Sequence, residues 1–131
     1  MIQIGIQSEV LRQIIDGRKT IEGRLGKEKF LRIKVGDELS IREDIYENGK
    51  IVGEVEDRLH LKIDGITKFH SFEQMLREAG YEKAIPTAKS LSDAVAAYRT
   101  YYSEDDENEY GVIGLEFHVI DKKYSRSASF V

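Results

Sequence analysis

The sequence contains no cysteine and only one proline, Pro86, among its 131 residues. Without cysteine the chain can form neither a disulfide nor a thiolate metal site, and it has no thiol nucleophile. It also has no run of about 18 apolar residues, the length that a membrane-spanning helix requires. The first residues carry no basic and apolar leader. These absences predict a soluble, cytoplasmic protein that does not associate with a membrane.

Histidine is also scarce, and His60, His70 and His118 have no second histidine two to four positions away. This spacing does not fit ligands of one metal ion. The acidic run Glu104–Glu109 lacks the glycine and the ordered alternation of a calcium-binding loop, so we interpret it as a solvated loop. The sequence therefore predicts no metal and no cofactor.

A mass of 15.0 kDa suits one domain with a sizeable core. We predict that this domain spans residues 1–120. Residues 121–131 are mostly polar, and we predict that they form a poorly ordered C-terminal tail.

The net charge of −4 is unevenly distributed along the chain. Residues 12–34 contain eight basic and three acidic side chains, which gives this segment a local charge of +5 and leaves −9 for the remainder. A basic patch on an acidic protein suits a local anionic ligand better than long duplex DNA, which would experience the field of the whole protein. Alternatively, the lysines and arginines only solvate this segment.

The stretch from Gly17 to Arg24 combines a turn, opposite charges and a β-prone segment. A helical apolar pattern precedes it, with Ser8 placed to cap the helix and Gly17 placed after its end, where positive φ is common. The following alternation predicts a strand with three polar side chains on one face: Thr20, Glu22 and Arg24. Together with Lys19 they could meet in one small cleft. The alternative is a solvated strand with a weak Glu22–Arg24 ion pair.

Short alternating segments joined by turns follow this stretch. Turn signals occur at Val35–Asp37 and at Asn48–Gly49, and Asn-Gly is the strongest short hairpin signal. Strands are predicted within residues 39–41, 51–55, 59–63 and 113–119. Because short turns connect most of them, we predict an antiparallel barrel or meander.

Two further helices are predicted by capping boxes at residues 71–74 and 90–93. The second helix ends in a segment that contains Tyr98, Arg99, Tyr101 and Tyr102. Neighbouring rings at 101 and 102 point about 100° apart on a helix, so at least one ring should be at the surface. A ring beside Arg99 offers a platform for an unstacked base. Alternatively, Tyr98 and Tyr102 only close the end of the barrel.

The pattern Gly17-x-Lys19-x-x-Glu22-x-Arg24 is similar to the G-x-K-x-x-x-x-R signature of the ASCH superfamily. The segments Val35–Ile41 and Gly111–Phe117 resemble two more of its elements, a VGD turn with its strand and the closing strand. The resemblance covers residues 4–120. It implies an α+β, PUA-like fold, in which an antiparallel β-barrel of about five to six strands is flanked by about three helices.

The resemblance also implies a function, because the family is associated with binding RNA or nucleosides between the barrel and its helices. We therefore predict a protein that binds single-stranded RNA or a modified nucleoside in a basic cleft. The predicted ligand-binding residues are Arg18, Thr20, Arg24, Tyr98, Arg99 and Tyr102.

The alternative is a hydrolase similar to the bacterial N4-acetylcytidine amidohydrolases of the family, or, as a weaker alternative, a ribonuclease. Lys19 matches the family lysine, and Glu22 stands where those enzymes have a threonine. Glu78 falls closest to the family glutamate, with Glu73 as an alternative register. Lys19 or Glu22 would then act as general base on water while Arg24 stabilises negative charge. The predicted catalytic residues are Lys19, Glu22 and Glu78.

A third interpretation is a protein-interaction module whose acidic segment 104–109 contacts a partner. The sequence leaves open which of the three activities the protein has.

Overall fold

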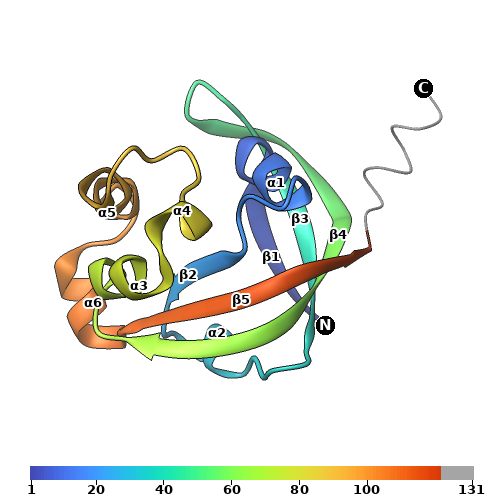
Figure 1. Cartoon of the computed structure of the whole chain (residues 1–131). Coiled ribbons are helices and arrows are strands. Elements are labelled where there is room, and N and C mark those ends of the chain that lie inside the picture. Colours follow the sequence, from blue (N-terminus) through green and yellow to red (C-terminus); the bar gives the residue numbers. More distant parts are fainter. Residues whose placement is uncertain (122–131) are drawn as a thin grey trace.

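The computed structural model describes residues 1–121 and contains one five-stranded sheet with six helices (Figure 1). The strands are β1 (Ile2–Gln7), β2 (Ile21–Leu25), β3 (Glu38–Glu47), β4 (Lys50–Phe69) and β5 (Val112–Asp121). The helices are α1 (Ser8–Ile15), α2 (Glu28–Leu31), α3 (Phe72–Ala79), α4 (Tyr81–Ala84), α5 (Leu91–Arg99) and α6 (Glu104–Tyr110). Asp121 belongs to β5, and the rest of the predicted tail lies outside the described residues.

The strand order is β1-β3-β4-β5-β2, so β1 and β2 form the two edges of the sheet. The prediction of an α+β protein is correct, but the sheet is mixed and not closed. Strand β1 pairs with β3 in parallel, and the other neighbours are antiparallel. The two edges meet through a side chain instead of a ladder, since Arg24 Nη2 on β2 donates to Gly5 O on β1 at 3.3 Å. The prediction of a purely antiparallel barrel is therefore not confirmed.

The hairpin between β3 and β4 turns at Asn48 and Gly49, with φ of 51° and 79°, as the Asn-Gly signal predicted. The two strands predicted after this turn are instead one strand, β4, of 20 residues (Figure 1). The ladder shifts register after Ile41, and Asp57 in the facing strand has a φ of 54°. A bulge of this kind bends a strand without ending it, so the polar residues near 57 are not a turn.

Three helices begin with a serine whose hydroxyl accepts a backbone N–H: Ser71 for α3, Ser90 for α5 and Ser103 for α6. The first two confirm the capping boxes. The third belongs to the acidic run, which is a helix and not the predicted loop. Four acidic residues in its first turn suit the positive end of a helix dipole. Ser8 is the first residue of α1 instead of its cap, and its hydroxyl donates to Glu43 Oε2 at 2.6 Å.

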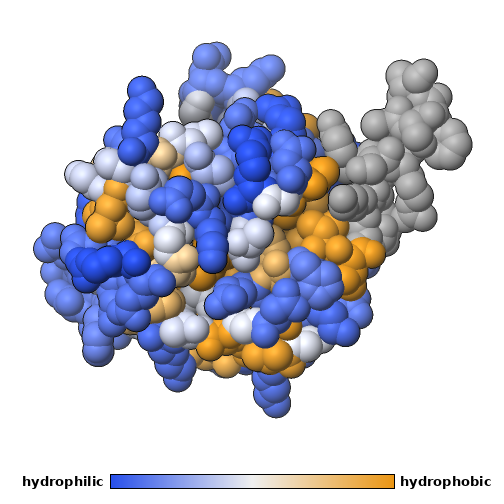
Figure 2. Space-filling model, in the orientation of Figure 1, coloured by the Kyte–Doolittle hydropathy of each residue, from blue (hydrophilic) through white to orange (hydrophobic). Residues whose placement is uncertain are grey.

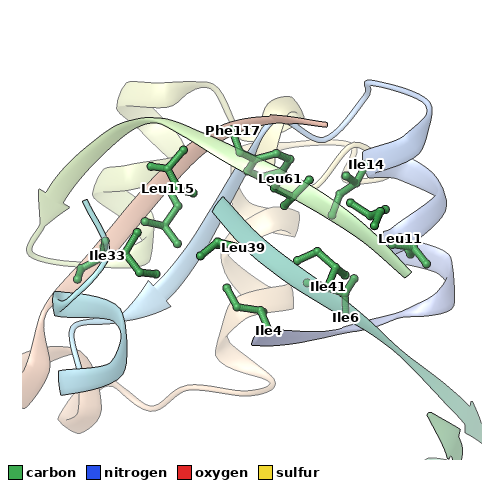
Figure 3. Packing of buried hydrophobic residues seen from close by; sticks show 13 residues of the cluster. Ile4, Ile6, Leu11, Ile14, Ile33, Leu39, Ile41, Leu61, Leu115 and Phe117 are labelled. Atoms are coloured by element: carbon green, nitrogen blue, oxygen red, sulfur yellow. The ribbon is translucent and has the colours of Figure 1, made fainter. Parts of the chain in front are cut away.

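Two apolar clusters build the core. The larger lies between the curved sheet and α1, where isoleucines and leucines from β1, β3, β4 and β5 interdigitate (Figure 3). The smaller joins β2 to α3 and α5 around Phe72 and Met75. Polar side chains cover much of the face in Figure 2, with apolar groups between them. No helix within residues 1–121 has the length and apolar character needed to cross a membrane.

Candidate functional site

A cleft of about 460 Å³ lies beside the two edge strands, where the sheet fails to close. Its walls come from β1, β2, β3, α1, α5 and the segments that flank α5. We call this hollow the cleft. It contains the end of the motif stretch that the sequence singled out, because Lys19, Glu22 and Arg24 all line it.

Lys19 is fixed at the base of this arrangement, with only 2% of its surface exposed. Its Nζ donates to two backbone carbonyl oxygens, Ala84 O at 2.6 Å and Ile21 O at 3.0 Å. The third contact is with Glu22 Oε1 at 3.1 Å. An ammonium group has three N–H donors, and all three are used here. Lys19 therefore positions Glu22 and ties β2 to α4, and it has no donor left for a ligand.

Glu22 is held ionised between two cations, and its side chain is 15% exposed. Arg24 donates to Glu22 Oε2 from Nε at 3.1 Å and from Nη2 at 2.8 Å. Burial alone would raise the pKa of Glu22, but the charges and hydrogen bonds of Lys19 and Arg24 outweigh it and lower the pKa to about 2. The cleft therefore contains a fixed carboxylate at neutral pH.

Arg24 is held by several contacts at once. Besides the fork on Glu22 and the bond to Gly5 O, its guanidinium lies 5.5 Å from the centre of the Phe30 ring. Burial lowers the pKa of Arg24, and the neighbouring Glu22 carboxylate more than compensates, so the net pKa is raised. Arg24 is thus a permanent cation that spans the seam between the two edge strands.

Three tyrosines at the end of α5 form one wall of the cleft: Tyr98, Tyr101 and Tyr102. Tyr98 and Tyr102 stack on Phe72 with ring centres at 4.4 Å and 4.9 Å, so they belong to the smaller core as well. Tyr101 is 66% exposed, as expected for at least one ring. Its hydroxyl accepts from Gln7 Nε2 at 3.1 Å. The wall thus has a fixed inner part and an accessible outer ring.

Gly23 allows the inner tyrosine to approach the strand. Its backbone N–H donates to Tyr98 Oη at 3.3 Å. A Cβ at this position would lie 2.7 Å from Met75 Cε and 3.1 Å from Tyr98 Oη. Burial raises the pKa of the Tyr98 hydroxyl, and the Glu22 carboxylate adds to this effect. The hydroxyl therefore stays neutral.

The structure brings some of the predicted site residues together and separates others. Lys19, Glu22, Arg24, Tyr98 and Tyr102 line the cleft. A second groove, here the outer groove, is lined by Thr20, Glu78, Lys83 and Glu116 among others. Thr20 and Glu78 are exposed there. The prediction that alternation places Thr20 beside Glu22 and Arg24 is therefore wrong, because β2 begins only at Ile21 and Thr20 precedes it.

The two remaining predicted residues make contacts away from the cleft wall. Arg18 is exposed and pairs with Asp16 at 3.1 Å. Arg99 pairs with the buried Glu107 of α6 at 2.7 Å and donates to Tyr102 O at 3.2 Å. Arg99 therefore anchors α6 and the tyrosine segment.

The cleft is not basic, which corrects the prediction drawn from the charge of residues 12–34. Its charged lining consists of three carboxylates and two cations: Glu9, Glu22, Asp44, Lys19 and Arg24. Asp44 is paired with Arg42 at 2.6 Å. Most of the basic side chains of this segment, such as those of Arg12 and Arg32, are exposed elsewhere. The sequence identifies the charges but not which of them share a hollow.

Sequence reasoning missed several polar cleft residues, among them Gln13, Asp44 and Thr87. Gln13 had a signal, since it is a polar residue beside the apolar stripe of α1. Asp44 and Thr87 had none, because neither belongs to a motif. Within residues 1–121 no group of three or more histidine, aspartate or glutamate side chains is arranged to hold a metal ion.

Comparison with known proteins identifies the family. The profile of the ASCH domain matches residues 4–121. The crystal structure of the hypothetical protein PH0355 is 37% identical, with a TM-score of 0.75 over 90% of this chain and 97% of that one. The solution structure of PF0455 from Pyrococcus furiosus is 34% identical, with a TM-score of 0.69 over 91% and 96% of the two chains.

A more distant structure shares the fold alone. A mutant of ZmASCH from Zymomonas mobilis is 12% identical, with a TM-score of 0.53 over 98% of this chain and 81% of that one. No curated protein matches the sequence significantly. The match of the domain profile to nearly the whole described chain decides the assignment: this protein belongs to the ASCH domain family.

Proposed function

We propose that the cleft binds a nucleobase, presented either by a nucleoside or by an unstacked base of single-stranded RNA. The observation that carries this proposal is the Glu22 carboxylate, which Lys19 and Arg24 hold ionised beside the tyrosine wall. A carboxylate accepts hydrogen bonds from ring and amino N–H groups of bases, and aromatic rings stack on their faces. An RNA-binding role is also proposed for the ASCH family.

The charges of the cleft favour a base over a phosphate as the bound group. Three carboxylates line it against two cations, and Lys19 has no donor left. A site that grips phosphates needs free lysine or arginine donors. The volume of about 460 Å³ falls in the usual range of small-ligand sites, about 300–1,000 Å³.

Calorimetric titration of the four ribonucleosides and of a short single-stranded RNA tests the proposal. We expect wild-type protein to bind at least one of them, and Tyr101→Ala to weaken that binding without loss of fold. The matched control is Tyr110→Ala, which removes another partly exposed ring, on α6. Binding to RNA but to no nucleoside would identify RNA as the source of the base. Absence of binding to every ligand would refute the proposal.

A second candidate is an amidohydrolase that removes the acyl group of N4-acetylcytidine. The observation that favours it is the contact of Lys19 with Glu22 at 3.1 Å inside a cleft. Two other observations favour binding without catalysis. The three donors of Lys19 are occupied, and Glu78 lines the outer groove instead of the cleft. A mass-spectrometric time course with wild type and Glu22→Gln separates the two. Conversion to cytidine by wild type alone would establish the enzyme, and no conversion by either would exclude this substrate.

A further inference from the structure

Gln13 is a polar residue that lines the cleft but does not belong to the charged cluster of Lys19, Glu22 and Arg24. It lies on α1 between Leu11 and Ile14, and only 5% of its surface is exposed. Its backbone carbonyl ends the helix, accepting the N–H groups of Arg18 and Lys19, both at 3.0 Å. Its side-chain amide lines the cleft, where its polar atoms are accessible, and it makes no hydrogen bond with residues 1–121.

The amide group of Gln13 carries two donors and one acceptor. An unpaired amide on the wall of a cleft is therefore expected to find its partner in the cleft, either water or a ligand.

Glu22 offers a second unfilled position nearby in the same hollow. Its Oε2 accepts two bonds from Arg24, whereas Oε1 accepts one from Lys19. Since each carboxylate oxygen can accept about two hydrogen bonds, one acceptor position remains on Oε1. The cleft thus presents one charged acceptor and one amide that can donate.

We propose that Gln13 and Glu22 together read the edge of a neutral heteroaromatic ring that carries an N–H donor next to an acceptor. Glu22 Oε1 accepts the ring N–H, and the Gln13 amide donates to the neighbouring acceptor while the tyrosines hold the ring face. This inference rests on the proposed nucleobase-binding function and names the recognition groups within it. It assigns Gln13 a role that neither the motif nor the charge pattern predicts.

Gln13→Met tests the role directly, because methionine has a similar length and no polar amide. Calorimetry would use the nucleoside, or the short RNA, that wild type binds most tightly. We expect about tenfold weaker binding, the usual scale for one lost hydrogen bond, together with an unchanged Tm because the amide makes no hydrogen bond within residues 1–121. A merely structural glutamine would give the opposite pair of results, a lower Tm and unchanged affinity, and that would overturn the inference.

The matched control is Gln3→Met on β1, which removes an amide that bonds Glu56 outside the cleft. We expect wild-type affinity from this variant. If only water satisfies Gln13, both variants would bind like wild type, and the inference would be wrong although the proposed function stands. If wild-type protein binds no nucleoside or RNA at all, the proposed function itself fails.

A ligand analogue provides an independent measurement. Methylation of the ring or amino N–H groups of the bound base removes the donor that Glu22 is proposed to accept. We expect wild type to bind the methylated analogue about tenfold more weakly, and Glu22→Gln to discriminate less between the two. Equal affinity of wild type for both ligands would contradict the proposed pairing.

Discussion

The cleft and the outer groove differ in how their charges are held. On the cleft side, Lys19, Glu22 and Arg24 are largely buried and bond one another. The outer groove presents Thr20 and Glu78 as exposed side chains. The comparison shows that a preorganised site arises here from charges that are removed from water together.

Replacing the buried Lys19 should give the largest difference in stability between variants of the two hollows. Lys19→Met leaves Glu22 without one cation and two backbone carbonyls without their donor. We expect the free energy of unfolding to fall by about 3–5 kcal/mol, the usual cost of breaking a buried pair. Lys83→Met in the outer groove should change it by less than about 0.5 kcal/mol. Urea unfolding measures both, and equal losses would remove the distinction.

Acid should weaken the charged cluster of the cleft. Because the pKa of Glu22 is about 2 in the folded protein and 4.5 in the free side chain, its ionisation stabilises the fold fully above about pH 4.5. This contribution is lost as the pH falls toward 2, and its size is about 3 kcal/mol.

Urea unfolding between pH 2 and 7 checks this dependence. Glu22→Gln should lose that part of the pH profile, and Glu116→Gln, which is exposed in the outer groove, should retain it. A Glu22→Gln profile parallel to that of wild type would show that the carboxylate is not held by its neighbours.

Packing beside the charged cluster should be tight on the cleft side. Gly23→Ala would place a Cβ 2.7 Å from Met75 Cε and 3.1 Å from Tyr98 Oη. We expect a loss of about 1–3 kcal/mol from overpacking. Gly53→Ala on β4, where the nearest side-chain atom would be 3.6 Å away, should be neutral or slightly stabilising. Thermal unfolding of both variants distinguishes tight from loose packing at Gly23.

The smallest expected effect on stability belongs to the accessible ring of the tyrosine wall. Tyr101→Ala should change the free energy of unfolding by less than about 0.5 kcal/mol, since the side chain is mostly exposed. The variant should bind the base with a free energy that is less favourable by about 1–3 kcal/mol, the range for one stacked base. If affinity is unchanged while Tyr110→Ala weakens binding, the bound base lies elsewhere.

Much of the fold followed from local patterns. The Asn48–Gly49 hairpin and the caps at Ser71 and Ser90 were predictable because each depends on a few neighbouring residues. The parallel pairing of β1 with β3 was not, because strands far apart in sequence make it and no local signal sets its direction. Nor could the sequence reveal that β4 continues through the bulge at Asp57.

The site was predictable in part for a similar reason. Alternation along β2 placed Glu22 and Arg24 on one face, and the structure confirms it. The same alternation placed Thr20 on that face, but Thr20 precedes β2 and lines the outer groove. Glu78 was assigned by analogy with the family glutamate, and it lines the outer groove too. Gln13 joins the cleft through the packing of α1 against the edge strands, a tertiary contact that its sequence position does not show.

Nuclear magnetic resonance titration compares the two hollows directly. Ribonucleosides and a short single-stranded RNA would be added in turn to isotope-labelled protein, and backbone amide shifts would be followed at Gly23 and Tyr101 for the cleft and at Glu78 and Glu116 for the outer groove. We predict saturable shifts at the cleft residues and none at the outer groove. Shifts confined to the outer groove, or no shifts with any ligand, would contradict the assignment of the cleft as the base-binding site.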